Sequence, residues 1–284
     1  MGKAHKVKAE YLDAKEMVEL LATLKDIADN KFFSTQRKRD KFRRFSESFA
    51  EYFNLLSMTE VKHPLVKNET KKVALIVATI EGGFLGEFNN KMIRKGLEEY
   101  KKHEDCELIA VGEKAIDPLS RYQKNIKSFT GTEPTKIYEM AVKIKDYIVD
   151  RMMKGEIGKV LICHTWYKSS DVQIPRVLQL LPCDDLIAQH SSFIGRLEKK
   201  VLEESSPNDV LGFLINLWLV TRLHSILIDT IVSSALAQSK FLEDALEKMK
   251  KEREKVQSKY RKAKKSDIDK SLREIFSAKM MVAK

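Results

Sequence analysis

The glycine-rich segment Glu81–Asn90 contains the residue types that a phosphate-binding loop uses. It follows a short apolar run and opens a helical stretch, where backbone amides can surround a phosphate. A Walker loop also needs a lysine directly after its last glycine, and a dinucleotide-binding turn needs the spacing G-x-G-x-x-G. The segment has neither, and Glu81 and Glu87 would repel phosphate. We therefore expect no cofactor and no small-molecule substrate here. A nucleotide-binding enzyme is the alternative, which binding of ATP to the isolated chain would reveal.

Histidines and cysteines form three loose pairs that could be fragments of a metal site. The pairs are His103 with Cys106, Cys163 with His164, and Cys183 with His190. None has the closely spaced cysteines of a structural zinc site, and three cysteines make an odd number for disulfides. We expect no metal ion and no disulfide framework, as in proteins of a reducing compartment.

Two neighbouring acids, Asp184 and Asp185, remain as candidates for acid–base chemistry. They lie beside Pro182 in a sequence typical of a turn, so we interpret them as solvent-exposed. The sequence predicts no catalytic residue.

Basic residues outnumber acidic ones, 52 to 41, and give the chain a net charge of +11. Such a charge suits nucleic acid, an anionic surface or acidic protein loops. The basic runs lie at Arg37–Arg39, Arg43–Arg44, Lys248–Lys251 and Lys259–Lys265. Glutamates and aspartates are interleaved with the later runs, which is typical of a solvated helix and not of a continuous phosphate-binding face. We therefore expect contacts with acidic protein loops and no nucleic acid.

Helix-breaking residues divide the 284-residue chain into three segments. All six prolines and nearly all glycines lie between Pro64 and Gly212. The predicted segments are a helix over 1–63, an α/β domain over 64–206 and a second helix over 207–284.

Apolar residues in both terminal segments recur in steps of three and four, which predicts a seam between paired helices. The seam residues are Met17, Leu20, Leu24 and Ile27 in the first helix, and Leu242, Ala245, Met249, Val256 and Tyr260 in the last. A last helix of some seventy residues would be on the order of 100 Å long and would project from any domain of this size. Separate core helices of a bundle are the alternative.

The middle segment alternates short apolar runs with helical stretches. Strands are expected at Lys72–Thr79, Leu108–Val111, Lys127–Thr130, Val160–Cys163 and Val172–Leu181, with helices at Phe88–Lys102 and Pro134–Lys154. This alternation predicts a small, partly parallel α/β domain.

Two segments resemble motifs of the gamma subunit of F-type ATP synthases. The turn that contains Gly83, Gly86, Phe88 and Asn89 is similar to the family's R-G-L-C-G-x-F-N-[ST], with its arginine and cysteine replaced. The segment Arg261–Ser277 is similar to N-K-A-R-Q-x-x-I-T-x-E-L-x-E-I, with matches that include Lys262, Ile268 and Glu274. A third, shorter similarity shares Ala28, Lys31 and Gln36.

The resemblance implies a Rossmann-like α/β domain inserted between two terminal helices that form a long antiparallel coiled coil. It implies a rotor shaft without an active site, which turns inside an alpha3–beta3 hexamer and packs beside an epsilon-like subunit and a membrane c-ring. The expected hexamer contacts are Lys262, Lys264, Lys265, Glu274, Phe276, Met280 and Met281.

The expected location is peripheral, on the cytoplasmic side of a membrane. Charges begin at Lys3, so no export signal is expected, and the apolar part of Leu211–Ala237 is interrupted by charges, so no membrane span is expected. The alternatives are a divergent gamma paralogue that serves another machine and a free coiled-coil adaptor.

Overall fold

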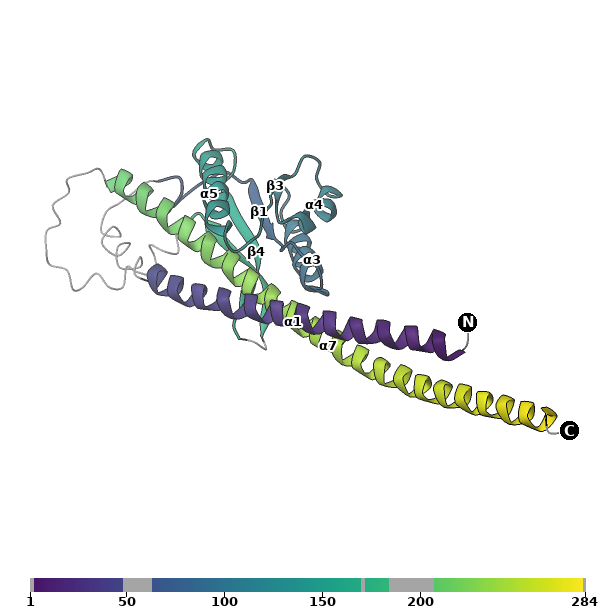
Figure 1. Ribbon diagram of the computed structural model, residues 1–284. Coiled ribbons are helices and arrows are strands. Elements are labelled where there is room, and N and C mark those ends of the chain that lie inside the picture. Colours follow the sequence, from purple (N-terminus) through teal and green to yellow (C-terminus); the bar gives the residue numbers. More distant parts are fainter. Residues whose placement is uncertain (1–2, 48–62, 170–171, 184–206, 283–284) are drawn as a thin grey trace. The chain divides into compact units, whose positions relative to one another are not determined.

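The computed structural model describes residues 3–47, 63–169, 172–183 and 207–282 (Figure 1). The chain divides into two compact units. The sheet unit comprises residues 30–237, and the helical pair comprises residues 1–29 with 238–284. Helices α1 (Lys3–Glu47) and α7 (Pro207–Val282) each contribute to both units. Residues 48–62 of the predicted first helix lie outside the described residues.

A five-stranded sheet organises the sheet unit in the order β3-β2-β1-β4-β5. The strands are β1 (Val73–Ala78), β2 (Cys106–Val111), β3 (Lys127–Phe129), β4 (Lys159–Tyr167) and β5 (Gln173–Leu181). All pairings are parallel except that of β4 with β5, which is antiparallel. The chain departs from β1 in one direction to β2 and β3 and in the other to β4, so a topological switch point lies between β1 and β4.

Alternate residues of the buried strand β1 pack into two different cores. Ala74, Ile76 and Ala78 join a cluster with α5 (Ile137–Met153) and the first half of α7. Val73, Leu75 and Val77 join a second cluster with α3 (Phe88–Tyr100) and α4 (Glu113–Ser120). The two-residue period of a strand therefore places helices on both faces, as the predicted α/β fold requires.

Helix α4 is an element that the sequence analysis did not predict. It is short, it begins after Gly112 and it contains Pro118. Both residue types normally interrupt helices, so the apolar periodicity of an eight-residue segment was hidden between them. Ala115 and Leu119, four residues apart, are the positions that it buries.

The helical pair is antiparallel, because a contact with a lower residue number on α1 has a higher residue number on α7. Asp29 accepts a hydrogen bond from Ser239, and the ring of Tyr11 stacks on that of Tyr260 with 6.1 Å between centroids. The start of α1 and the end of α7 consequently lie toward the same end of the pair (Figure 1). The predicted antiparallel coiled coil is confirmed.

The seam of the helical pair is shifted by one residue from the predicted positions on α1. Its buried residues are Val18, Leu21, Ala28, Leu242 and Leu246. Met17, Leu20 and Ile27 are instead 43%, 53% and 58% exposed, so that part of the prediction is wrong. Two adjacent apolar stripes run along α1, and α7 covers only one of them.

One helix among the described residues, α7 over Asn208–Lys279, is long and apolar enough to cross a membrane by length and composition alone. Half of its most apolar window is buried within the protein. The side chains from Leu211 to Ala235 that pack on the sheet account for this apolar character. A single helix of this kind is weak evidence for a membrane span.

Candidate functional site

The glycine-rich turn follows β1 at the carboxyl edge of the sheet, and Asn89 holds it closed. The Asn89 side chain accepts a hydrogen bond from the Ile80 amide at 3.1 Å and donates one to the Ile80 carbonyl at 2.8 Å. Both groups are buried, so they need this partner. Asn89 therefore connects the end of β1 to the first turn of α3.

The other motif residues shape the same turn. Gly86 has φ +52°, a left-handed conformation that glycine adopts without steric cost. Phe88 opens α3 and packs against the core on the α5 side of the sheet, while Gly83 lies in the turn itself. The structure thus brings together Gly83, Gly86, Phe88 and Asn89, the four motif residues, as a folded connection.

The carboxylate of Glu81, at the start of the turn, is held by backbone amides of the loop after β3. It accepts hydrogen bonds from the backbone amides of Gly131 at 2.8 Å and Thr132 at 3.3 Å, and the Glu81 amide donates to the Thr132 hydroxyl at 2.9 Å. These contacts lie beside the switch point, where open α/β sheets bind ligands. The Glu81 carboxylate therefore connects the end of β1 to the loop after β3.

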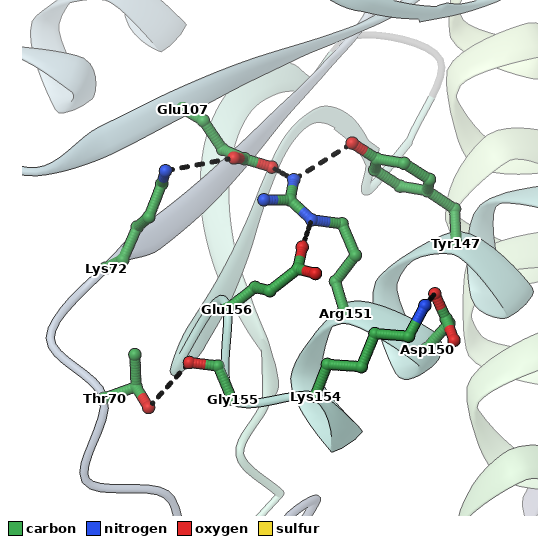
Figure 2. A network of polar contacts seen from close by, with 9 residues as sticks. All are labelled: Thr70, Lys72, Glu107, Tyr147, Asp150, Arg151, Lys154, Gly155 and Glu156. Atoms are coloured by element: carbon green, nitrogen blue, oxygen red, sulfur yellow. Dashed lines mark hydrogen bonds and ion pairs between the residues drawn. The ribbon is translucent and has the colours of Figure 1, made fainter.

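A second polar network lies at the opposite, amino edge of the sheet (Figure 2). Arg151, in the last turn of α5, binds Glu107 of β2, donates to Glu156 at 2.7 Å and to the Tyr147 hydroxyl at 3.0 Å. Lys72 approaches Glu107 at 3.7 Å from the other side. Burial disfavours the Arg151 charge, but the hydrogen bonds that Arg151 donates to Glu156 and Glu107 outweigh it, so the pKa of Arg151 is raised.

This network is a structural connection between α5 and the starts of β1 and β2. Each of its two carboxylates is paired with a cation, which leaves neither poised for proton transfer. A hydrogen bond at 3.3 Å from Thr70 to the Gly155 carbonyl continues the connection into the loop after α5.

Among the cysteines of the predicted loose pairs, Cys163 and Cys183 are buried and Cys106 is half-buried. Burial raises the pKa of Cys106 and of Cys163 to about 12, which makes both poor nucleophiles and poor metal ligands near neutral pH. Within the described ranges, no group of three or more histidine, cysteine, aspartate or glutamate side chains could hold a metal ion. His190, Asp184 and Asp185 lie outside those ranges.

The expected hexamer contacts lie on the last turns of α7. Lys262, Lys264, Lys265 and Glu274 are exposed, and Phe276 is 66% exposed. Met280 and Met281 belong to the helix, but their side chains are outside the described part. Ile268, Leu272 and Ile275 form an exposed apolar stripe on the same turns.

An interhelical joint that the sequence analysis did not predict occurs in the sheet unit. Arg39 of α1 pairs with Asp229 of α7 and donates to the Tyr167 carbonyl at 3.3 Å. Its guanidinium lies over the Tyr167 ring, 5.0 Å from the centroid. The prediction that the run Arg37–Arg39 contacts other proteins stays a prediction, but the charge of Arg39 is paired within the chain. The one usable signal was Asp229, an acid within an apolar helical run.

The chain is similar to known proteins over nearly its whole length. The ATP synthase family model matches residues 5–280. ATP synthase gamma chains are 23% identical in Actinobacillus pleuropneumoniae, covering 97% of this chain and 98% of the relative, and 24% identical in Heliobacterium modesticaldum, covering 95% of each.

Solved structures share the fold. The rotor of Euglena gracilis mitochondrial ATP synthase superposes with a TM-score of 0.61 at 16% identity, covering 93% of this chain and 98% of that one. The central stalk and c-ring structure of the Tetrahymena thermophila mitochondrial enzyme gives 0.61 at 16% identity, covering 80% and 99%. The family match spans the glycine-rich turn, both terminal helices and the sheet between them. This chain therefore belongs to the ATP synthase family, as a gamma chain.

Proposed function

We propose that this chain is the central rotor shaft of an F-type ATP synthase, which couples rotation to conformational change in the catalytic subunits. The observation that carries the proposal is the end of α7. Its turns after Tyr260 expose Ile268, Leu272, Ile275 and Phe276, although such side chains normally seek burial. A helix of 76 residues is about 114 Å long at 1.5 Å per residue, so it can reach deep into a partner assembly.

The proposed partner is an alpha3–beta3 hexamer that surrounds the helical pair. Lys262, Lys264 and Lys265 would contact acidic loops of the hexamer, and Phe276, Met280 and Met281 would lie in an apolar collar where a shaft can turn without directional bonds. Glu274 would add a polar contact on the same turns. The solved structure of Euglena ATP synthase that contains OSCP, F1 and the c-ring supports this assignment, because its chain superposes with a TM-score of 0.65 over 99% of this one.

The sheet unit would be the foot of the shaft, beside an epsilon-like subunit and a membrane c-ring. The chain would then be a peripheral component on the cytoplasmic side of the membrane and would have no active site of its own. The glycine-rich turn lacks both the Walker lysine and the G-x-G-x-x-G spacing, which supports this absence of nucleotide chemistry. Rotation of an asymmetric shaft would drive the surrounding subunits through their states in turn.

The experiment is a deletion of residues 265–284 in the complete complex purified through a tag on this chain. We expect the truncated complex to retain alpha-like and beta-like subunits and nucleotide binding, while ion translocation per ATP hydrolysed falls. Purification of the full-length chain without any ATPase subunit would contradict the proposal, and so would loss of nucleotide binding by the truncated complex.

A further inference from the structure

Arg39 is the residue through which α1 reaches two other elements of the sheet unit at once. Its Nε donates to Asp229 of α7, and its Nη2 donates to the carbonyl of Tyr167, the last residue of β4. The same guanidinium covers the Tyr167 ring, which also contacts Phe32 of α1 with 6.2 Å between centroids. One side chain thus connects two shaft helices to the sheet.

The two shaft helices are held to the sheet very unequally. Helix α7 supplies ten residues to the core on that face: Leu211, Ile215, Leu219, Leu223, Ile226, Leu227, Ile228, Ile231, Val232 and Ala235. Within the part of α1 whose side chains are described, Phe32 is the single contribution to that core, and Thr35 is a buried neighbour. Among the described side chains of the sheet unit, α7 is therefore held to the sheet by broad apolar packing, and α1 by Phe32 and the Arg39 joint.

The joint is sheltered from water, which makes its contacts directional and costly to break. The side chains of Arg39 and Asp229 are 20% and 13% exposed, and Tyr167 is 5% exposed. Burial raises the pKa of Asp229, and the hydrogen bond from Arg39 opposes that rise. A guanidinium that donates from two nitrogens fixes both the distance and the orientation of its partners.

We propose that Arg39 is a positioning residue for torque transmission, which locks α1 to α7 and to the end of β4 so that both helices turn with the sheet unit. The inference rests on the proposed function, since it assigns the joint a task only in a rotating shaft. Removal of the joint should let α1 slip under load, so that ATP hydrolysis continues while less ion translocation accompanies each turnover.

The test measures ATP hydrolysis and ion translocation by the complete complex in sealed vesicles. Arg39→Met and Asp229→Asn each remove one side of the pair, and their double variant completes a mutant cycle. Lys15→Met is the matched control, because Lys15 is a cation of α1 whose ion pair with Glu19 stays within that helix and is exposed. The second readout is amide hydrogen exchange of residues 32–39 in the full chain.

We expect translocation per ATP to fall several-fold in both single variants while Lys15→Met leaves it unchanged, with the double variant no worse than the poorer single one. Unchanged coupling in Arg39→Met and Asp229→Asn overturns the inference, and so do additive losses in the double variant. If Arg39→Met does not assemble, Arg39→Lys decides the question. It keeps the charge but cannot donate from Nε and Nη2 together, and normal coupling in it would count against the joint.

Failure of the proposed function is recognised separately, because the wild-type complex would then not translocate ions on ATP hydrolysis. The joint would still be judged by exchange in the full chain alone. Faster exchange of residues 32–39 in Arg39→Met than in Lys15→Met supports the lock, and equal exchange in both refutes it.

Discussion

At the scale of single residues, Asn89 shows how a motif can be structural and not catalytic. Its amide satisfies both the N–H and the C=O of Ile80, groups that no water can reach. The Asn89→Ala variant should therefore lose about 2 to 3 kcal/mol of stability, the usual cost of leaving buried polar groups unpaired. Urea unfolding followed by tryptophan fluorescence measures this, since Trp166 and Trp218 both lie in the sheet unit.

The matched control for this substitution is the neighbouring Asn90→Ala. Asn90 is exposed and donates only to Glu87 at 3.3 Å, so its loss should change stability by less than about 0.5 kcal/mol. Equal losses in the two variants would show that the hydrogen bonds between Asn89 and Ile80 contribute nothing to stability.

His164 gives the sheet unit a dependence on pH. His164 is 3% exposed, and its Nδ1 has no hydrogen-bond partner among the described residues. Burial, with further repulsion from Arg176 and Arg222, lowers its pKa from 6.5 to about 4. Because the folded pKa is depressed, the stability due to neutral His164 is complete above pH 6.5 and is lost as pH falls toward about 4.

Between about pH 7 and about pH 5, wild type should therefore lose about 2 kcal/mol more than His164→Leu, which has no group to protonate. The measurement is the free energy of unfolding from urea titrations at each pH. His5→Gln, a change at an exposed position of α1, should behave as wild type. A His164→Leu variant with the same pH slope as wild type would disprove the assignment.

Residue-level prediction from the sequence succeeded where a residue acts locally and failed where it acts across the fold. Asn89 was found because it lies in a compact motif next to the strand that it serves. Arg39 was predicted to contact other proteins. Its partner Asp229 is 190 residues away, and no local sequence pattern indicates a pair at that separation. The charge of Arg39 indicated an acidic partner, and the acid paired with it in the structure belongs to the same chain.

At the scale of elements, α7 has a packed middle and an unpacked end. Leu242 is fully buried in the seam of the helical pair, whereas Leu272 is 48% exposed. Leu242→Ala should lower the local stability of the helical pair by about 2 to 3 kcal/mol, with correspondingly faster amide exchange at residues 18–28. Leu272→Ala, the same change on the same helix, should leave that exchange unaltered in the isolated chain.

In the complete complex, Leu272→Ala should weaken binding to the hexamer more than Leu242→Ala does. Leu272→Ala removes apolar surface that the hexamer is proposed to cover, while Leu242 is already covered by α1. A Leu272→Ala complex that assembles and couples as wild type would indicate that this stripe makes no contact.

Element positions followed well from the sequence, while the register of the seam did not. All five strands and helices α1, α3, α5 and α7 lie where apolar runs and helix breakers indicated. The seam on α1 could not be chosen because Met17, Leu20 and Ile27 have the same periodicity as Val18, Leu21 and Ala28. Only the helix that packs against them distinguishes the two stripes, and that choice is a tertiary one.

At the scale of the whole molecule, the charge of +11 should govern association with an acidic partner. Lys264 and Lys265 are exposed on α7, and exposed charges act mainly on association rates and on salt sensitivity. We expect the variant Lys264→Ala with Lys265→Ala to bind the hexamer several-fold more slowly at low salt and to approach wild type near 1 M salt, where screening removes the difference. Stopped-flow association at several salt concentrations checks this.

The matched control is Lys114→Ala with Lys143→Ala, which removes the same charge from exposed positions of the sheet unit. Equal slowing in both double variants would mean that net charge alone matters and that the end of α7 makes no specific contact.

The order of synthesis follows from the antiparallel pairing of α1 with α7. Asp29 meets Ser239, and Tyr11 meets Gln257 and Tyr260, so each contact joins one of the first residues made to one of the last. At 5 to 20 residues per second, the ribosome needs roughly 10 to 45 seconds to extend the chain across the 210 residues between Asp29 and Ser239. Throughout that time the apolar stripe of α1 has no partner helix to pack against, because the α7 residues Leu242 and Leu246 have not yet been made. During synthesis the apolar stripe of α1 therefore stays exposed. We expect chaperones that recognise short apolar segments to bind it as it leaves the ribosome.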